Sequence, residues 1–310
     1  MTEKKDLVNI TDLSRKEIYA IFEKAKFYKF QRKKGILVDD VLRGKSIGLL
    51  FRKPSSRTRI SFEVAIIELG GSPIFLETSQ LQISRGETTE DTARVLNLYL
   101  KGLVIRTYQQ SEVESFARIV DFPVINGLTD SFHPCQILAD FFTIWEHKKN
   151  LEEVVVTYIG DPNNVCNTLI LAADILGVRI NVSCPSEYSV SKQIVNIMEN
   201  PHLLKVSDDP YSFVPESDVI YTDTWVSMGD ETEKEKRLEI FKKFQVNEKL
   251  VKNAPANFLF MHCLPAHRGQ EVTDAVIDGN NSVVWQQAEN RLHVQKSILH
   301  FLYSEAEDEL

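Results

Sequence analysis

The feature that most constrains this fold is a regular alternation of short apolar runs with longer segments of helical periodicity. Several of the runs are apolar almost throughout, as expected for strands that helices cover on both faces. The runs that predict strands span residues 46–51, 72–76, 103–108, 123–126, 154–160, 179–184, 218–223 and 257–263. This order predicts an α/β fold in which parallel sheets are flanked by helices.

Helical patterns are strongest in four segments, which span residues 58–69, 136–148, 163–176 and 291–303. The first ends at Gly70-Gly71 and the third at Gly177, and glycine is the residue most typical of a helix C-cap. In the second, Ile137, Phe141 and Ile144 fall on one stripe, as in an amphipathic helix. The fourth is expected to close the fold.

The length of the chain predicts its number of domains, and its net charge argues against some functions. At about 100–200 residues per domain, 310 residues predict two domains with about four strands each. We expect the boundary in the polar stretch near Lys148, so that residues 1–148 form one domain and 149–291 the other. The net charge of −8 argues against a nucleic-acid or membrane-surface role for the whole molecule.

The termini and cysteines indicate a cytoplasmic protein. The first residues are polar, unlike a signal peptide, and no apolar run approaches the roughly 20 residues that cross a bilayer. The four cysteines are scattered and form no CxxC pair, which favours a reduced protein.

A cationic, hydroxyl-rich run follows the first predicted strand and opens a helix. Ser55, Ser56 and Thr58 supply hydroxyls, and Arg57 and Arg59 supply guanidinium groups, within five residues. Free N–H groups at a helix start attract anions, and arginine grips phosphate oxygens in a bidentate fork. A serine N-cap followed by solvated arginines explains the same run. The Walker A pattern GxxxxGK[ST] is absent.

Two further positions in the first half are candidates for the same anion site. Arg106 stands near the end of a predicted strand, where ligands gather in α/β sheets, although a surface arginine is the simpler explanation. His133 and Gln136 flank Pro134 at the start of a predicted helix. A histidine there can stabilise charge on a carbonyl oxygen, but a lone histidine is more often structural.

Polar groups also follow three predicted strands of the second half. Asn163 and Asn164 suit recognition of an amino acid, and they equally suit a turn. Asp223 offers a carboxylate to a substrate ammonium group. The dinucleotide fingerprint GxGxxG is missing, which argues against a nicotinamide cofactor. The run from Trp225 to Gly229 is not a nucleophile elbow GxSxG, because Trp225 occupies the first glycine position.

Cys263 lies at the end of the last predicted strand, in the run His262-Cys263-Leu264-Pro265. The histidine and cysteine spacing matches no common zinc pattern, so we predict no metal. A covalent cysteine nucleophile remains open. Arg291, at the predicted start of the last helix, is a third cation for the pocket.

Taken in order, these motifs resemble those of the aspartate/ornithine carbamoyltransferase family over residues 7–303. The family usually has threonine where this chain has Ser56, and serine keeps the hydroxyl. His133-Pro134-Cys135-Gln136, Ser227-Met228-Gly229 and His262-Cys263-Leu264-Pro265 resemble the ornithine branch. The resemblance implies transfer of the carbamoyl group of carbamoyl phosphate to ornithine, a homotrimer and no cofactor. It also implies that the last helix, with residues 292–310, packs back on the first domain.

The resemblance implies a role for each matched residue. Phosphate would be held by Ser55, Ser56, Arg57 and Thr58. Other carbamoyl phosphate contacts would be Arg106, His133, Gln136, Cys263, Leu264 and Arg291, together with Gln82 from a neighbouring subunit. Ornithine would be held by Asn164, Asp223, Ser227 and Met228. Arg106, His133, Asp223 and Cys263 would carry the chemistry.

Two alternatives stay open beside this interpretation. A sister transferase would use putrescine, acetylornithine or aspartate as the acceptor. A non-catalytic anion-binding paralogue is expected to have lost one of Arg57, Arg106, His133 or Cys263, and all four are present.

Overall fold

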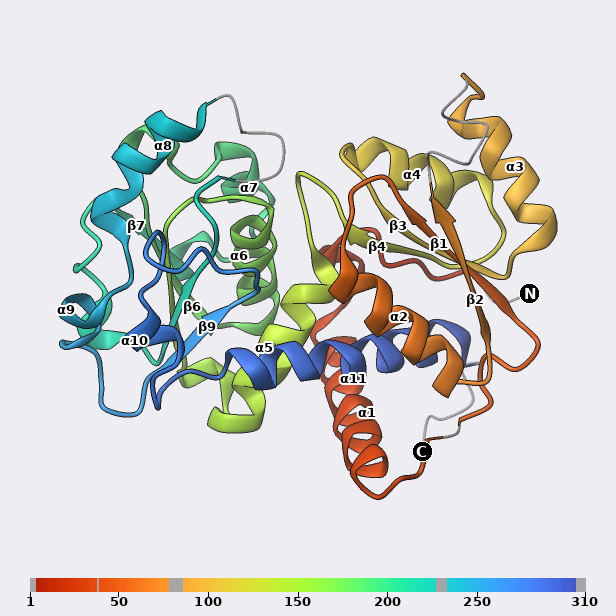
Figure 1. The fold of residues 1–310 in the computed structure, drawn as a ribbon, viewed down its shortest axis with the longest axis horizontal. Coiled ribbons are helices and arrows are strands. Elements are labelled where there is room, and N and C mark those ends of the chain that lie inside the picture. The colour runs from red at the N-terminus through yellow and green to blue at the C-terminus, as the bar shows by residue number, and fades with distance from the viewer. Residues whose placement is uncertain (1–3, 38, 78–85, 227–232, 305–310) are drawn as a thin grey trace. The chain divides into compact units, whose positions relative to one another are not determined.

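The computed structural model describes residues 4–37, 39–77, 86–226 and 233–304. The chain divides into two compact units (Figure 1). The first takes the chain up to Leu138 together with the chain from Asn290 onward, and the second spans Ala139–Glu289. Each unit holds one parallel sheet flanked by helices, which confirms the predicted fold class.

The first sheet has the strand order β2-β1-β3-β4. Its strands are β1 (Ser46–Phe51), β2 (Ser72–Glu77), β3 (Gly102–Arg106) and β4 (Val124–Leu128). The central strands β1 and β3 are almost wholly buried, which explains their continuous apolar character. Phe51 pairs with Arg106, so β1 and β3 end at the same level of the sheet.

Helices of the first unit pack around this sheet. They are α1 (Arg15–Lys33), α2 (Ser56–Glu68), α3 (Thr89–Tyr99), α4 (Gln110–Ile119) and the start of α5 (Pro134–Lys148). Helix α1, which was not predicted, begins with a capping box between Ser14 and Glu17, a helix start signal that the sequence itself contains.

The last helix, α11 (Val284–Tyr303), packs its second half on the first unit, as predicted. Lys296 Nζ lies 2.9 Å from Glu68 Oε2 at the end of α2, and Ser297 Oγ donates to the carbonyl of Ile21 in α1. Its predicted start at Arg291 is wrong. Residues 284–290 contain no proline or glycine that would stop a helix, so α11 begins seven residues earlier, at Val284.

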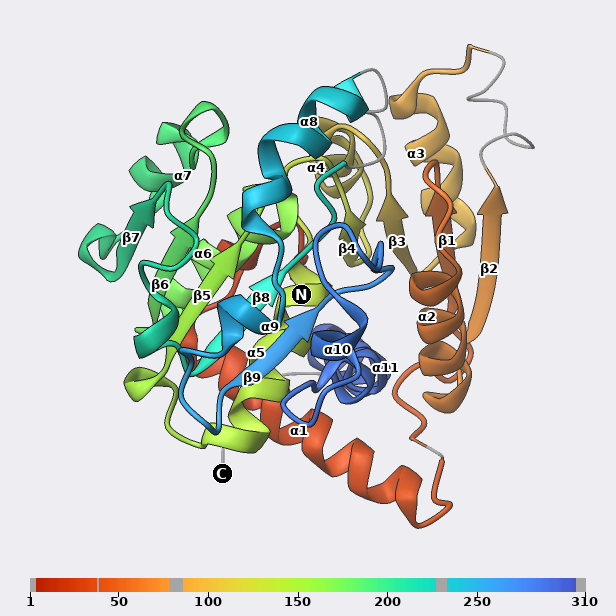
Figure 2. The ribbon, with the colours of Figure 1, turned by 60° about the vertical axis from the view of Figure 1, so that its left-hand side comes forward.

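The second sheet has the order β7-β6-β5-β8-β9. Its strands are β5 (Val155–Ile159), β6 (Arg179–Ser183), β7 (Leu204–Ser207), β8 (Val219–Thr222) and β9 (Leu259–His262). The prediction of four strands missed β7. This strand lies at the edge of the sheet (Figure 2), where its half-exposed residues need no continuous apolar run.

Five helices belong to the second unit beyond α5: α6 (Asn164–Leu176), α7 (Lys192–Ile197), α8 (Lys234–Phe241), α9 (Glu248–Val251) and α10 (Asp274–Ile277). Short 3-10 helices span Ile10–Asp12, Leu151–Glu153, Ser186–Tyr188, Pro201–Leu203, Val214–Glu216 and Lys242–Phe244. Helix α6 ends at Gly177, whose φ of +72° is a left-handed conformation that glycine adopts without strain. None of the helices in the described ranges combines the length and apolar character of a membrane span.

Candidate active site

The turn after β1 and the start of α2 form the first candidate anion site. Ser55 is the N-cap of α2, and its hydroxyl accepts from the backbone N–H of Thr58 at 3.3 Å. The same hydroxyl donates to Thr58 Oγ1 at 3.1 Å. Thr58 is buried, whereas Ser56 and Arg57 are exposed. The start of α2 therefore combines the N–H groups of a helix N-terminus with the hydroxyls of Ser55 and Thr58, an arrangement that suits an anion.

Arg291 of α11 reaches this turn. Its Nη2 donates to Thr58 Oγ1 at 2.6 Å, and the residue is buried. A buried guanidinium beside the positive end of a helix dipole is unfavourable unless an anion compensates it. The contact between Arg291 and Thr58 therefore places a buried cation beside the N-terminus of α2.

Arg106 and His133 add to the same electrostatic environment. Arg106 is the last residue of β3, and His133 directly precedes α5. Burial is the main cause of a pKa for His133 well below its ordinary value, followed by the charges of Arg291 and Arg106. His133 is thus a neutral imidazole at pH 7, able to donate a hydrogen bond to a carbonyl oxygen without adding charge.

The neighbours of His133 support this turn. Gln136, which is buried, donates its backbone N–H to the carbonyl of His133 at 3.2 Å. Burial raises the pKa of the Cys135 thiol to about 12. Cys135 is therefore an inert packing residue rather than a nucleophile.

Lys53 belongs to the same turn but was missed from the sequence. It is 3% exposed, forms an ion pair with Asp130, and its Nζ lies 4.4 Å from the ring centroid of Tyr108. These partners follow β4 and β3 in the chain, so no local sequence pattern could have identified them.

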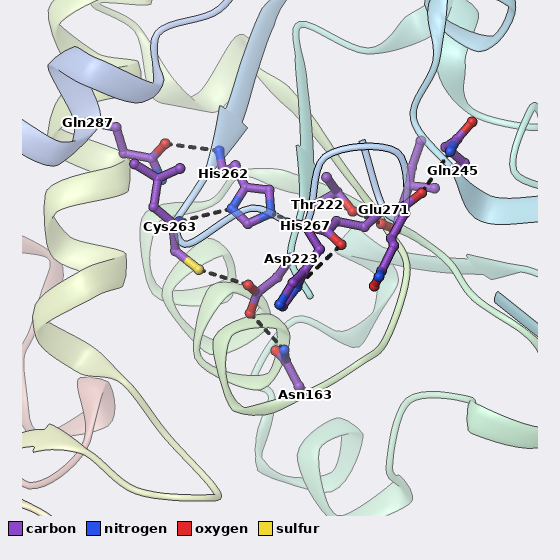
Figure 3. Close-up of polar contacts among 12 residues, drawn as sticks. Asn163, Thr222, Asp223, Gln245, His262, Cys263, His267, Glu271 and Gln287 are labelled. Carbon is purple, nitrogen blue, oxygen red and sulfur yellow. Dashed lines mark hydrogen bonds and ion pairs between the residues drawn. The ribbon is translucent and has the colours of Figure 1, made fainter. Parts of the chain in front are cut away.

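In the second unit, Asp223 follows β8 and is held by two donors (Figure 3). Cys263 Sγ donates to Asp223 Oδ1 at 3.0 Å, and Asn163 Nδ2 donates to Asp223 Oδ2 at 2.8 Å. The structure thus brings the predicted residues Asp223 and Cys263 into direct contact. The carboxylate is buried and can bind a substrate ammonium group, while the half-buried thiol remains accessible.

The adjacent asparagines have different partners. Asn163 caps α6 through Oδ1, which accepts from the backbone N–H groups of Val165 and Cys166. The side-chain amide nitrogen of Asn163 takes no part in the cap and donates to Asp223 instead. Asn164, which the sequence analysis selected, accepts from the N–H of Val165 at 3.0 Å. The sequence indicates Asn163 as either a recognition residue or a turn former, and neither signal reveals its contact with Asp223.

His262 positions the turn that carries Cys263 (Figure 3). The N–H of Leu264 donates to His262 Nδ1 at 2.9 Å, so the ring proton lies on Nε2, which donates to Glu271 Oε1 at 3.2 Å. Leu264 has a φ of +59°, an uncommon value for leucine, and the buried imidazole stabilises it.

The backbone of His262 is fixed from another side. Its N–H donates to Gln287 Oε1 at 3.0 Å, and Gln287 in turn donates to Asp140 Oδ1 at 2.7 Å. Tyr221 donates to the other oxygen of Asp140 at 2.8 Å. Cys263 is therefore supported by a buried side-chain network.

Donor atoms of Asp223, His262 and Cys263 lie within 4.8 Å of one another, close enough to hold a metal ion. Both ring nitrogens of His262 are already engaged, one as an acceptor and the other as a donor. A metal at this place would have to displace Leu264 or Glu271. The donor set therefore fits a hydrogen-bonded network better than a metal centre.

Arg237 of α8 is a second residue that the sequence analysis missed. It is 6% exposed, its Nη2 lies 2.5 Å from Asp161 Oδ2, and its Nε donates to the carbonyl of Trp225 at 2.7 Å. The guanidinium also stacks against the ring of Tyr188, 4.7 Å from the centroid. Asp161 precedes the asparagines and Trp225 follows Asp223, so Arg237 ties both polar turns together.

Three predicted contacts, Gln82, Ser227 and Met228, lie outside the described residues.

Comparison with known proteins finds two family models that match successive parts of the chain. Residues 5–146 match the family model described as aspartate/ornithine carbamoyltransferase, carbamoyl-P binding domain. Residues 152–302 match the one described as the Asp/Orn binding domain of the same family.

Individual relatives are similar over nearly the whole chain. The ornithine carbamoyltransferase of Pyrococcus horikoshii is 48% identical over 303 residues, which cover 96% of this chain and 95% of that protein. A Pyrococcus furiosus protein named ornithine carbamoyltransferase, anabolic, is 48% identical over 300 residues and 95% of each chain. The solved structure of ornithine carbamoyltransferase from Pyrococcus furiosus superposes with a TM-score of 0.92, at 47% identity and 97% coverage of both chains. The chain belongs to the aspartate/ornithine carbamoyltransferase family.

Proposed function

We propose that this enzyme transfers the carbamoyl group of carbamoyl phosphate to the side-chain amine of L-ornithine, giving L-citrulline and phosphate. The observation that carries the proposal is the buried contact of Arg291 with Thr58 at the start of α2. It concentrates positive charge and hydrogen-bond donors on one point, as a phosphate dianion requires. Relatives named ornithine carbamoyltransferase support the choice of substrates.

We assign carbamoyl phosphate to residues 1–148 with 292–310, of which residues 5–146 match the model described as carbamoyl-P binding. The proposed contacts within this part are Ser55, Ser56, Arg57, Thr58, Arg106, His133 and Gln136. Arg291, directly before residue 292, is a further proposed contact. Gln82 of a neighbouring subunit, Cys263 and Leu264 complete the proposed set. Arg57 is exposed whereas Arg106 and Arg291 are buried, so its side chain has more freedom than theirs to turn toward a phosphate.

We assign ornithine to residues 149–291, where the matching model is described as Asp/Orn binding. Asn164, Asp223, Ser227 and Met228 are the proposed contacts. The buried carboxylate of Asp223 supports this assignment, because its two hydrogen-bond donors fix its direction and leave its negative charge for a cation.

The reaction follows from these charges. The lone pair of the neutral side-chain amine attacks the carbonyl carbon, and negative charge develops on the carbonyl oxygen. Arg106, Thr58 and neutral His133 stabilise that charge. The bond to the phosphate oxygen then breaks, the phosphate leaves with the electron pair, and the amine loses a proton. No metal or organic cofactor enters this scheme.

Ornithine is normally protonated at its side chain, with a lysine-like pKa of about 10. The amine must therefore lose a proton before it attacks. We assign to Asp223 and Cys263 the task of orienting ornithine and favouring the neutral amine. A thiol that donates to a carboxylate provides a short path for a proton.

Ornithine, putrescine, acetylornithine and aspartate, each assayed with labelled carbamoyl phosphate, test the proposal. We expect citrulline from ornithine at a kcat/KM at least roughly a hundredfold above that of any other acceptor, because a site that binds charged groups rejects ligands lacking them. A higher kcat/KM with putrescine would instead identify a sister transferase. No product with any acceptor would favour a non-catalytic anion-binding paralogue.

We further infer that the enzyme is a cytoplasmic homotrimer in arginine biosynthesis. Exposed apolar side chains on α2 and α3 of the first unit support an assembly: Ile60, Ile67, Leu98 and Tyr99 are 58–75% exposed. The name of the Pyrococcus furiosus relative supports the anabolic direction, and the scattered cysteines support the compartment.

Sedimentation equilibrium should give three times the chain mass, and Leu98→Asp should lower that mass. A monomeric wild type would contradict the trimer.

A further inference from the structure

We propose that Glu112 is a positioning residue for carbamoyl phosphate, which fixes the turn after β1 against the end of β3. Neither residue 112 nor its partners Arg52 and Thr107 belong to the proposed substrate contacts. The proposal rests on the proposed function, since it concerns the geometry of the site that we assign to carbamoyl phosphate.

The two oxygens of one carboxylate hold two different strand ends. Glu112 lies in the first turn of α4. Its Oε1 lies 2.5 Å from Nη2 of Arg52, the residue that follows β1. Its Oε2 accepts from Oγ1 of Thr107, the residue that follows β3, at 2.5 Å. Glu112 thus bridges the carboxyl ends of β1 and β3.

Backbone contacts reinforce this bridge. The N–H of Arg52 donates to the carbonyl of Arg106 at 2.8 Å, directly beyond the pair formed by Phe51 and Arg106. The N–H of Thr107 donates to the carbonyl of Leu128 at the end of β4. Glu112 therefore acts where the phosphate turn, Arg106 and the turn leading to His133 are joined.

The ion pair between Glu112 and Arg52 is partly shielded from solvent. The side chain of Glu112 is 12% exposed, that of Arg52 is 26% exposed, and Thr107 is fully buried. A partly buried pair is screened less by water and salt than a surface pair. Arg52 stands three residues before Ser55, and Thr107 is adjacent to Arg106. Movement of either strand end would shift a phosphate donor away from its place and so weaken the binding of carbamoyl phosphate.

Steady-state kinetics of Glu112→Gln and Glu112→Ala test the role. The amide keeps an acceptor for Thr107 but loses the charge opposite Arg52, whereas alanine loses both contacts. We expect the KM for carbamoyl phosphate to rise about tenfold for Glu112→Ala and a few-fold for Glu112→Gln. The KM for ornithine and the kcat at saturation should change less than about twofold.

Glu114→Gln is the matched control, because Glu114 is exposed on the same helix and the substitution removes the same charge. It should leave all three kinetic constants unchanged. A double-mutant cycle with Arg52→Met separates positioning from a loss of fold. The Arg52→Met and Glu112→Gln effects on the KM for carbamoyl phosphate should be non-additive, because each removes the same ion pair.

Calorimetric titration with inorganic phosphate tests the proposal even if the proposed reaction fails. Weaker phosphate binding by Glu112→Ala, with an unchanged melting temperature, supports positioning whether or not the wild type makes citrulline. An unchanged dissociation constant for phosphate and an unchanged KM for carbamoyl phosphate in Glu112→Ala would overturn it. Equal losses in kcat and both KM values, in step with a lowered melting temperature, would show a merely structural role and also overturn it.

Discussion

The proposed phosphate region of the first unit and the proposed ornithine region of the second are built by different means. The former uses one continuous turn at a helix N-terminus, where the backbone and Ser55 provide donors in fixed directions. The latter uses side chains from three separate strand ends, which meet at Asp223. A short motif can therefore specify the turn at the centre of the first region, although Arg291 joins it from far along the chain. The second region has no such continuous centre.

Their electrostatics also differ. The first region gathers Arg106, Arg291 and the positive end of α2 around a neutral histidine. The second surrounds one buried carboxylate with an amide and a thiol donor, and a buried arginine holds the adjacent turns. Each region thus has the charge opposite to its proposed ligand group, although the whole chain carries −8.

Removing the exposed cation of the first region should have the largest effect. Arg57→Gly is expected to nearly abolish turnover, because a lost donor to the developing charge costs about 3–4 kcal/mol, or more than a hundredfold in rate. Citrulline formation at saturating substrates is the measurement. Arg59→Gly introduces the same helix-weakening glycine, but its arginine is engaged with Glu63 at 2.8 Å, so it should retain turnover. Near-normal rates for Arg57→Gly would refute the assignment of the phosphate turn.

Asp223→Asn should impair ornithine use in the second region without changing phosphate binding in the first. Loss of the negative charge is expected to lower kcat/KM for ornithine roughly a hundredfold, since a charged hydrogen-bond partner contributes about 1.5–3 kcal/mol. Binding of inorganic phosphate, followed by calorimetry, should be unchanged. Equal losses of phosphate and ornithine affinity would show that the regions are not independent.

Arg237→Met should weaken ornithine binding through the turns that Arg237 holds. We expect an increase of about tenfold in the KM for ornithine, together with a lower melting temperature, because Asp161 loses its buried partner. Lys236→Met, at the exposed neighbouring position, is the control and should leave ornithine use intact. If Arg237→Met changed only the melting temperature, the residue would support the fold without positioning the site.

The smallest expected effect concerns His133. This residue should make the free energy of unfolding depend on pH. Its folded-state pKa is lowered, so below about pH 6.5 the unfolded chain binds a proton that the folded chain does not. Its contribution to the free energy of unfolding therefore falls as the pH drops below that value. Relative to His133→Gln, the wild type should lose up to about 1.4 kcal/mol per pH unit there.

Urea unfolding of the two proteins between pH 5 and 8 measures this difference. Since other titrating groups are common to both proteins, the difference isolates His133. Parallel stability curves would mean that His133 is not buried as a neutral ring.

Much of the fold was readable from the sequence because its signals are local. The strand β1 was predicted with its observed bounds, and the end of α6 at Gly177 follows from glycine chemistry. The edge strand β7 was missed because a half-exposed strand has no continuous apolar run, and helix α1 was missed because its apolar positions are interspersed with lysines.

Some residues of the candidate site were likewise predictable from local patterns, and others were not. The hydroxyl and arginine run is contiguous, so its N-cap and anion-binding character were predictable. Lys53, Glu112 and Arg237 form ion pairs with partners 60–77 residues away, which no local pattern encodes. Asn163 was one of two adjacent candidates, and its cap function gives no sign of its contact with Asp223.

The most direct test of this account is a crystal structure of the enzyme with a bisubstrate mimic, in which a phosphonate is joined to ornithine. The account predicts that Arg57 and Thr58 contact the phosphonate and that the carboxylate of Asp223 contacts an ornithine nitrogen. A structure in which Arg57 and Thr58 face bulk water while the ligand binds elsewhere would contradict it.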